Sequence, residues 1–177
     1  MAILIPASTI LTSLCLFHIT LAYFFYTDPQ TIADQALVFF LGEATGMPHT
    51  QHFSKPSPSS ALLAVVLLLL GISDLITLSM PEEIWLVHYW CAQAPARIVV
   101  FGLLTLFSYL TTPSSHAPAR SYGTGSGADG LRNRVFFAFA FLECLSWVWA
   151  WFTLREEAAE FAKRKRRRAS TAAREQS

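Results

Sequence analysis

Four long hydrophobic stretches alternate with polar segments along the chain. They cover residues 3–26, 61–80, 84–112 and 135–154. A helix needs about 20 residues to cross the hydrocarbon core of a bilayer, and each stretch is that long. A chain this short could not bury four such helices from water, whereas in lipid each helix satisfies its own backbone groups. The pattern predicts an all-α integral membrane protein, a four-helix bundle.

The polar segments between these stretches predict two connections of different character. Residues 27–60 begin with Asp28-Pro29, which should end the first spanning helix. Residues 31–41 are predicted to form one short amphipathic helix, too short to span and therefore interfacial or re-entrant. Residues 113–130 are rich in glycine, serine and proline and are predicted to be a flexible loop.

Charge is scarce and unevenly placed. Only 14% of residues are charged and 53% are hydrophobic, against roughly 25% charged residues in soluble domains. The chain divides into a transmembrane domain, residues 1–154, and a basic tail, residues 155–177, which is predicted to begin helical and end disordered. Positive charge concentrates on the cytosolic side of membrane proteins. Both termini are therefore predicted to be cytosolic, and the short amphipathic helix lumenal. Aromatic belts predict that Trp147 lies near the cytosolic interface.

Each stretch contains an ionisable side chain well inside its hydrophobic run. A charge at mid-bilayer depth costs roughly 2.5–3.5 kcal/mol, so these groups should have partners or lie near water. Counted at about 1.5 Å per residue from the predicted cytosolic ends of their spans, Arg97 and Glu143 lie at similar depths. The sequence predicts that these two pair, with the other two nearby. The predicted intramembrane polar centre consists of His18, Asp74, Arg97 and Glu143.

A second interpretation of Arg97 stays open. Pro95 suits the first turn of a helix, so the third span could begin there. Residues 84–93 would then lie in the interface, and Arg97 would extend to the cytosolic headgroups. The roles of the four residues are open too: each could hold helices together, or contact an ion, a proton or a ligand.

The tail carries a polybasic run that predicts attraction to anionic cytosolic lipids. The alternative is a solvated segment without a partner. The run ends beside a serine in the sequence pattern that basophilic kinases favour, and a phosphate there would weaken the attraction. No aromatic residue is interleaved with the basic ones, so nucleic-acid binding is not predicted. The residues are Lys163, Arg164, Lys165, Arg166, Arg167, Arg168 and Ser170.

The sequence contains no catalytic motif of a common hydrolase, metalloprotease, P-loop or dinucleotide-binding type. It predicts no catalytic residue, no metal site and no cofactor. It favours a non-enzymatic role, and leaves an integral-membrane lipid enzyme as a third possibility behind ion, solute or lipid handling.

Two distinctive strings resemble a known family. They are "TDP…ADQALVFFLGEA.GMP", from Thr27, and "SDL.TLSMPEE…HYW..QAPAR", from Ser73. They resemble the fungal "increased loss of mitochondrial DNA" protein family, and the resemblance runs from about residue 16 to 109. It implies a small multi-pass protein of the endoplasmic reticulum membrane that affects mitochondrial DNA indirectly. It implies no catalytic residues.

These observations give the function expected from sequence. The chain is predicted to be a non-enzymatic membrane protein that binds a membrane-protein partner or assists assembly. The alternative is a small module for ion or solute transport or for lipid binding.

Overall fold

The computed structural model describes residues 5–49, 53, 55–111 and 129–175, and the regular structure in this part is helical throughout. Four helices are long and apolar enough to cross a membrane, which confirms the all-α class. The predicted loop at residues 113–130 lies, except for its last two residues, outside the described part. The four helices are α1 (Ala7–Thr27), α4 (Pro58–Thr77), η2 with α5 (Glu83–Trp90 and Cys91–Leu110) and α6 (Arg134–Glu175).

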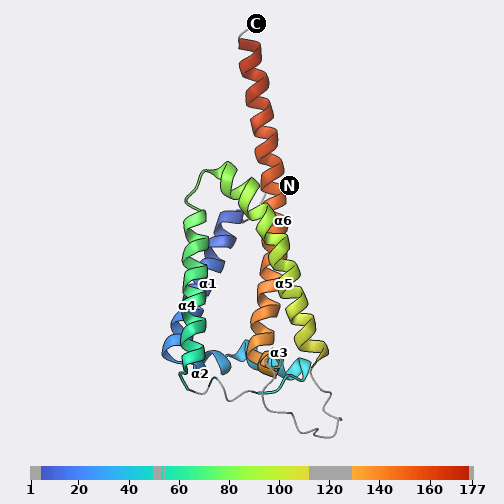
Figure 1. The fold of residues 1–177 in the computed structure, drawn as a ribbon. Helices are drawn as coiled ribbons and strands as arrows, with labels where there is room; N and C mark the ends of the chain where they lie inside the picture. The colour runs from blue at the N-terminus through green and yellow to red at the C-terminus, as the bar shows by residue number, and fades with distance from the viewer. Residues whose placement is uncertain (1–4, 50–52, 54, 112–128, 176–177) are drawn as a thin grey trace.

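The long helices associate as two pairs (Figure 1). α1 packs mainly against α4, and α5 packs mainly against α6, with a smaller contact between α1 and α6. The start of α1 and the end of α6 lie toward the same end of the molecule. A hydrogen bond from the Ala7 backbone N–H to Glu157 Oε1 (2.8 Å) fastens the first turn of α1 to α6 at this end. We call it the tail end.

Two hydrophobic cores hold the pairs together, one at each end of the helices. The core at the tail end is built from α1, η2, α5 and α6, and includes the large side chains Trp90 and Trp147. The core at the opposite end also includes the two short helices that follow α1. The members of this second core are Ala22, Phe25, Ile32, Ala33, Val38, Ala64, Leu67, Val135 and Ala138.

Local sequence explains where α4 begins and why it lies so close to α1. Ser57 caps α4 by accepting a hydrogen bond from the Ser60 N–H, and Ser60 Oγ accepts one from the Ser57 N–H, which forms a capping box. Gly71 faces α1, where a Cβ atom would lie 2.9 Å from the Cys15 carbonyl oxygen. The absence of a side chain at Gly71 therefore permits the close approach of the two helices.

The prediction of a single short helix at residues 31–41 is wrong. The segment forms two helices, α2 (Pro29–Ala33) and α3 (Ala36–Thr45). The chain breaks between them because Gln35 has an extended backbone, φ −61° and ψ 134°. α3 lies against the start of α6, where a Cβ on Gly42 would come within 2.8 Å of Arg134 Cβ.

The third long helix changes its character along its length. η2 is a π-helix, and it continues without a break into α5, which also contains Pro95. π-helical turns are wider than α-helical ones and occur where a helix is distorted. Within η2, Leu86 and Trp90 belong to the tail-end core, and Ala158 and Phe161 of α6 pack against that core.

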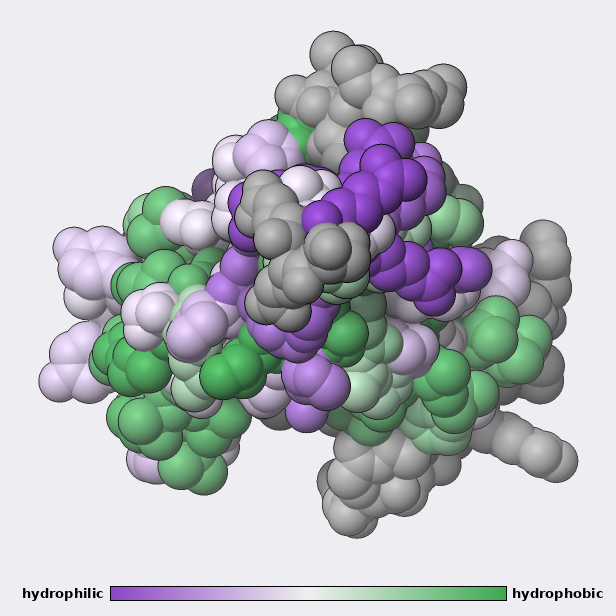
Figure 2. All heavy atoms as spheres, turned by 90° about the horizontal axis from the view of Figure 1, so that it is seen from above, coloured by the Kyte–Doolittle hydropathy of each residue, from purple (hydrophilic) through white to green (hydrophobic). Residues whose placement is uncertain are grey.

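α6 is a single helix of 42 residues. The prediction that the tail ends in disorder is wrong for its described residues, because they continue α6 as far as Glu175. Beyond the other helices α6 projects alone (Figure 1). Seen along this direction, hydrophilic side chains gather over the middle of the molecule and hydrophobic ones cover its flanks (Figure 2).

Candidate functional site: a polar network between the helix pairs

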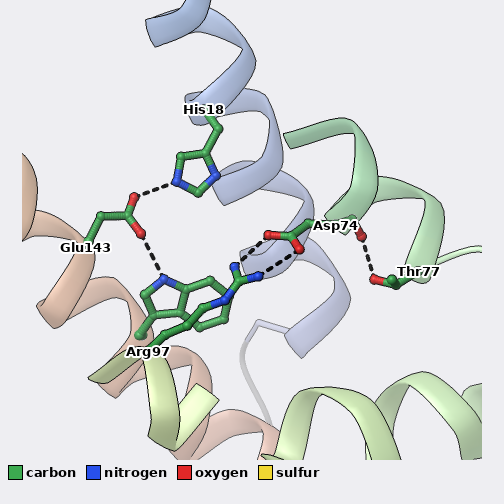
Figure 3. Close-up of polar contacts among 6 residues, drawn as sticks. His18, Asp74, Thr77, Arg97 and Glu143 are labelled. Atoms are coloured by element: carbon green, nitrogen blue, oxygen red, sulfur yellow. Dashed lines mark hydrogen bonds and ion pairs between the residues drawn. The ribbon is translucent and has the colours of Figure 1, made fainter. Parts of the chain in front are cut away.

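A histidine near the middle of α1 meets a glutamate of α6. His18 Nε2 of α1 lies 2.9 Å from Glu143 Oε1 of α6 (Figure 3), and both side chains are 1% exposed. The second carboxylate oxygen, Oε2, accepts a hydrogen bond from Trp147 Nε1 at 2.8 Å. Trp147 follows Glu143 by four residues, the spacing that places two side chains on one face of a helix. Both oxygens of the buried carboxyl group thus have partners.

An arginine and an aspartate form a second contact, nearer the tail end. Arg97 of α5 donates two hydrogen bonds to the Asp74 carboxylate of α4, at 2.6 and 2.9 Å. This bidentate geometry is the strongest arrangement for an arginine–carboxylate pair. Thr77 Oγ1 donates a hydrogen bond to the Asp74 backbone carbonyl oxygen at 2.7 Å, so the Thr77 hydroxyl also has a partner.

Two tryptophan rings connect these contacts. The rings of Trp90 and Trp147 stack with centroids 5.4 Å apart. The Arg97 guanidinium lies over both, 5.2 Å from the Trp90 centroid and 4.6 Å from that of Trp147. A cation over an aromatic face is attracted by the ring quadrupole. Trp147 therefore contacts Arg97 through its ring and Glu143 through its N–H.

The network joins one helix pair to the other. His18 and Asp74 belong to the α1–α4 pair, whereas Glu143 and Arg97 belong to the α5–α6 pair. In lipid, the hydrophobic effect does not drive helices together, and packing and hydrogen bonds hold them instead. These two contacts therefore stabilise the arrangement of the pairs inside the membrane.

The predicted Arg97–Glu143 pair is wrong, although the four predicted residues do gather in one network. The error came from counting depth along single helices, which does not show which neighbouring helix a side chain faces. Arg97 faces Asp74 of α4, whereas the Glu143 carboxylate bonds His18 and Trp147.

The second interpretation of Arg97 placed residues 84–93 in the interface, and that placement stays a prediction. These residues belong to η2 and the start of α5, which form one continuous helix. The arginine, however, does not extend to the headgroups, since its guanidinium binds Asp74 and its side chain is 16% exposed.

Sequence reasoning missed the roles of both tryptophans. Trp147 does not lie at the surface as an aromatic belt residue; it is 1% exposed and packs against Trp90. The four-residue spacing from Glu143 was the available signal. Trp90 had no comparable signal, because its contact depends on how η2 packs.

A groove follows the line where α1 meets α6. It consists of two apolar hollows of about 380 and 310 Å³, and Phe17 and Leu142 line both. None of the four network residues lines either hollow. Within the described part of the chain, no group of three histidine, cysteine or acidic side chains is arranged to hold a metal ion.

The polybasic run is helical and partly neutralised by the α4–η2 connection. Arg164 contacts Glu82 at 3.2 Å, and Lys165 contacts Glu83 at 2.5 Å. We call these two contacts the clasp. The hydrogen bond and charge of Lys165 lower the pKa of the Glu83 carboxyl from its ordinary value.

Comparison with known proteins agrees with the sequence resemblance. Residues 5–164, most of the chain, match the family described as increased loss of mitochondrial DNA protein 1. Neither the curated proteins nor the solved structures provide a match. The match includes all four long helices up to the clasp, and with them every residue of the polar network. The chain belongs to the increased loss of mitochondrial DNA protein 1 family.

Proposed function

We propose that this chain is a non-enzymatic, multi-pass protein of the endoplasmic reticulum membrane that binds a partner or assists assembly. Its effect on mitochondrial DNA is then indirect. The family links the chain to the maintenance of mitochondrial DNA, and four apolar helices link it to a membrane. The placement in the endoplasmic reticulum rests on the family resemblance of the sequence.

One observation carries the non-enzymatic part of the proposal: the intramembrane ionisable groups are engaged with one another. His18 and Glu143 are enclosed, and Asp74 uses both carboxylate oxygens on Arg97. Catalysis or ion passage needs a group that can meet its substrate. A network in which each member has a protein partner instead supports a structural task, which is to hold the helix pairs in one arrangement for a partner.

Affinity purification in a mild detergent tests the proposal. Wild type should co-purify with a protein partner in fixed proportion, and Glu143→Gln, which weakens the junction between the pairs, should retain less of it. Leu145→Gln on the exposed side of α6 serves as a matched control and should keep the partner, since Leu145 is 51% exposed. A wild-type preparation without any protein partner would refute the assembly role.

The groove between α1 and α6 favours a second candidate function, lipid binding. Its two hollows are apolar and meet at Phe17 and Leu142, as an acyl chain lying along the helices requires. Leu142→Trp should fill the groove and reduce the amount of lipid that co-purifies, as measured by mass spectrometry. Leu145→Trp adds the same volume outside the groove and should leave the lipid unchanged.

A further inference from the structure

The polybasic part of α6 divides into a covered and an uncovered portion. Lys163 contacts Glu160 at 2.9 Å, and the clasp occupies Arg164 and Lys165. One step further along the helix, the next three arginines are exposed and project beyond the other helices (Figure 1). The uncovered portion is Arg166, Arg167 and Arg168.

The direction of α6 carries these arginines away from the bilayer. Arg155 is the first cation after the fourth hydrophobic stretch, and its guanidinium lies over the Trp151 ring at 5.0 Å. Arg166 follows eleven residues later, about 16 Å further along the helix. The headgroup layer is only about 5–7 Å thick, and the potential of anionic lipids decays over about 8 Å. The bilayer that holds the protein therefore attracts the uncovered portion weakly.

The clasp shows what kind of chemistry fits this helix. Two consecutive glutamates, Glu82 and Glu83, bind two consecutive cations at 3.2 and 2.5 Å. Arg168 follows Arg164 by one helical turn, so it extends the face that the glutamates occupy. A second acidic segment could lie along α6 directly above the first, in the same type of contact.

We propose that residues 166–168 form a docking surface for an acidic segment of a cytosolic protein partner. The helix is already formed, so binding would not have to order the basic residues first. This inference rests on the proposed function, because it gives the partner of an assembly factor its chemistry and its place on the chain.

Ser170 lies where it can regulate this surface. It is one turn beyond Arg166 and Arg167, and its hydroxyl donates to the Arg167 carbonyl at 2.8 Å. A negative group at this position would pair with those arginines and compete with an acidic segment. Ser170→Glu should therefore weaken docking, whereas the uncharged control Ser170→Gln should not.

Peptide binding to the full-length protein in nanodiscs of neutral lipid tests the surface. The probe is a fluorescent glutamate-rich peptide, and a glutamine-rich peptide of the same length is its control. We expect the glutamate peptide to bind about tenfold more tightly than the control, measured by fluorescence anisotropy at physiological salt. Replacing Arg166, Arg167 and Arg168 together with glutamine should abolish that difference.

Two further arms separate docking on the helix from other uses of the same charge. Ala169→Pro keeps all three arginines but breaks their turn, and should weaken binding of the glutamate peptide; full binding would overturn the proposal. Adding anionic lipid to the nanodiscs should leave peptide binding to wild type unchanged. If anionic lipid blocks the peptide, the arginines bind their own bilayer and the proposal is overturned.

The result in cells separates this inference from the proposed function. If the co-purifying partner is lost from the triple glutamine variant, docking through residues 166–168 is supported. If the partner remains with that variant, it uses another surface, which overturns the docking inference and leaves the assembly role standing.

Discussion

The chain places carboxylate–cation pairs in two contrasting regions. Asp74 and Arg97 meet at 2.6 Å between helices, with side chains only 3% and 16% exposed. Glu83 and Lys165 meet at 2.5 Å in the clasp, with side chains 48% and 65% exposed. The two distances are nearly equal, so the energetic difference between the pairs comes from their surroundings.

That difference separates the tasks of the two regions. An ion left without its partner inside a protein or a bilayer is strongly destabilising. Water and salt replace a lost partner at the surface at little cost. The inner pair therefore fixes the arrangement of the helices, whereas the outer pair can open and close.

Removing Arg97 should cause the largest loss. Arg97→Met leaves the Asp74 carboxylate buried without a partner, and should lower the free energy of unfolding by about 3–5 kcal/mol. The measurement is unfolding in mild micelles by titration with a denaturing detergent. Adding Asp74→Asn to the same chain should recover much of the loss. Simple additivity of the two substitutions would show that they do not interact.

Glu143 should be more sensitive to loss of its hydrogen bonds than to loss of its charge. Glu143→Gln keeps a group that can bond His18 and Trp147, and should cost about 1–3 kcal/mol. Glu143→Leu leaves His18 Nε2 and Trp147 Nε1 buried without a hydrogen-bond partner, and should unfold more easily in the same titration. Equal stability of the two variants would argue against the hydrogen bonds described.

Trp147→Phe isolates one bond of the network. The substitution keeps an aromatic ring near Trp90 and Arg97 but removes the N–H that bonds Glu143. The expected cost is about 1–3 kcal/mol, because the buried Glu143 oxygen is left without its donor. Trp149→Phe is a matched control on the same helix, because Trp149 is 55% exposed. A comparable loss in the control would mean that the buried bond contributes nothing specific.

Opening the clasp should change a distance more than it changes stability. The double substitution Glu82→Gln and Glu83→Gln should leave the free energy of unfolding nearly unchanged. It should move the α4–η2 connection away from α6, as measured by the distance between spin labels on the two. Acid should act in the same direction. Because Lys165 lowers the pKa of Glu83 in the folded protein, the contact should persist at neutral pH. It should be lost as the pH falls through that lowered pKa.

A clasp that stays closed in acid and in high salt would contradict the conclusion that the outer pair opens and closes while the inner pair is fixed.

The spanning helices could be predicted from sequence because membrane thickness sets their length. The runs around His18 and Asp74 are apolar over the required distance, and the helices appear there. The break at Gln35 could not be predicted in the same way. No proline or glycine marks this break. The chain turns there because α2 and α3 both pack in the core at the end opposite the tail end.

Membership of the polar network could be predicted, but the partner of each residue could not. An isolated charge in an apolar run reveals that a partner exists, and all four residues have one. The identity of the partner depends on which helices face each other at that level. For Arg97 the partner is Asp74 of α4, and Glu143 of α6 bonds His18 and Trp147 instead.

The unbroken course of α6 has a mechanical consequence. One helix about 60 Å long carries Glu143 and Trp147 in its membrane portion and the uncovered arginines at its far end. Because no break separates these points, a force or a rotation applied to the outer turns of α6 is transmitted to the contact between the two helix pairs. A molecule that binds the outer turns can therefore act mechanically on the polar network.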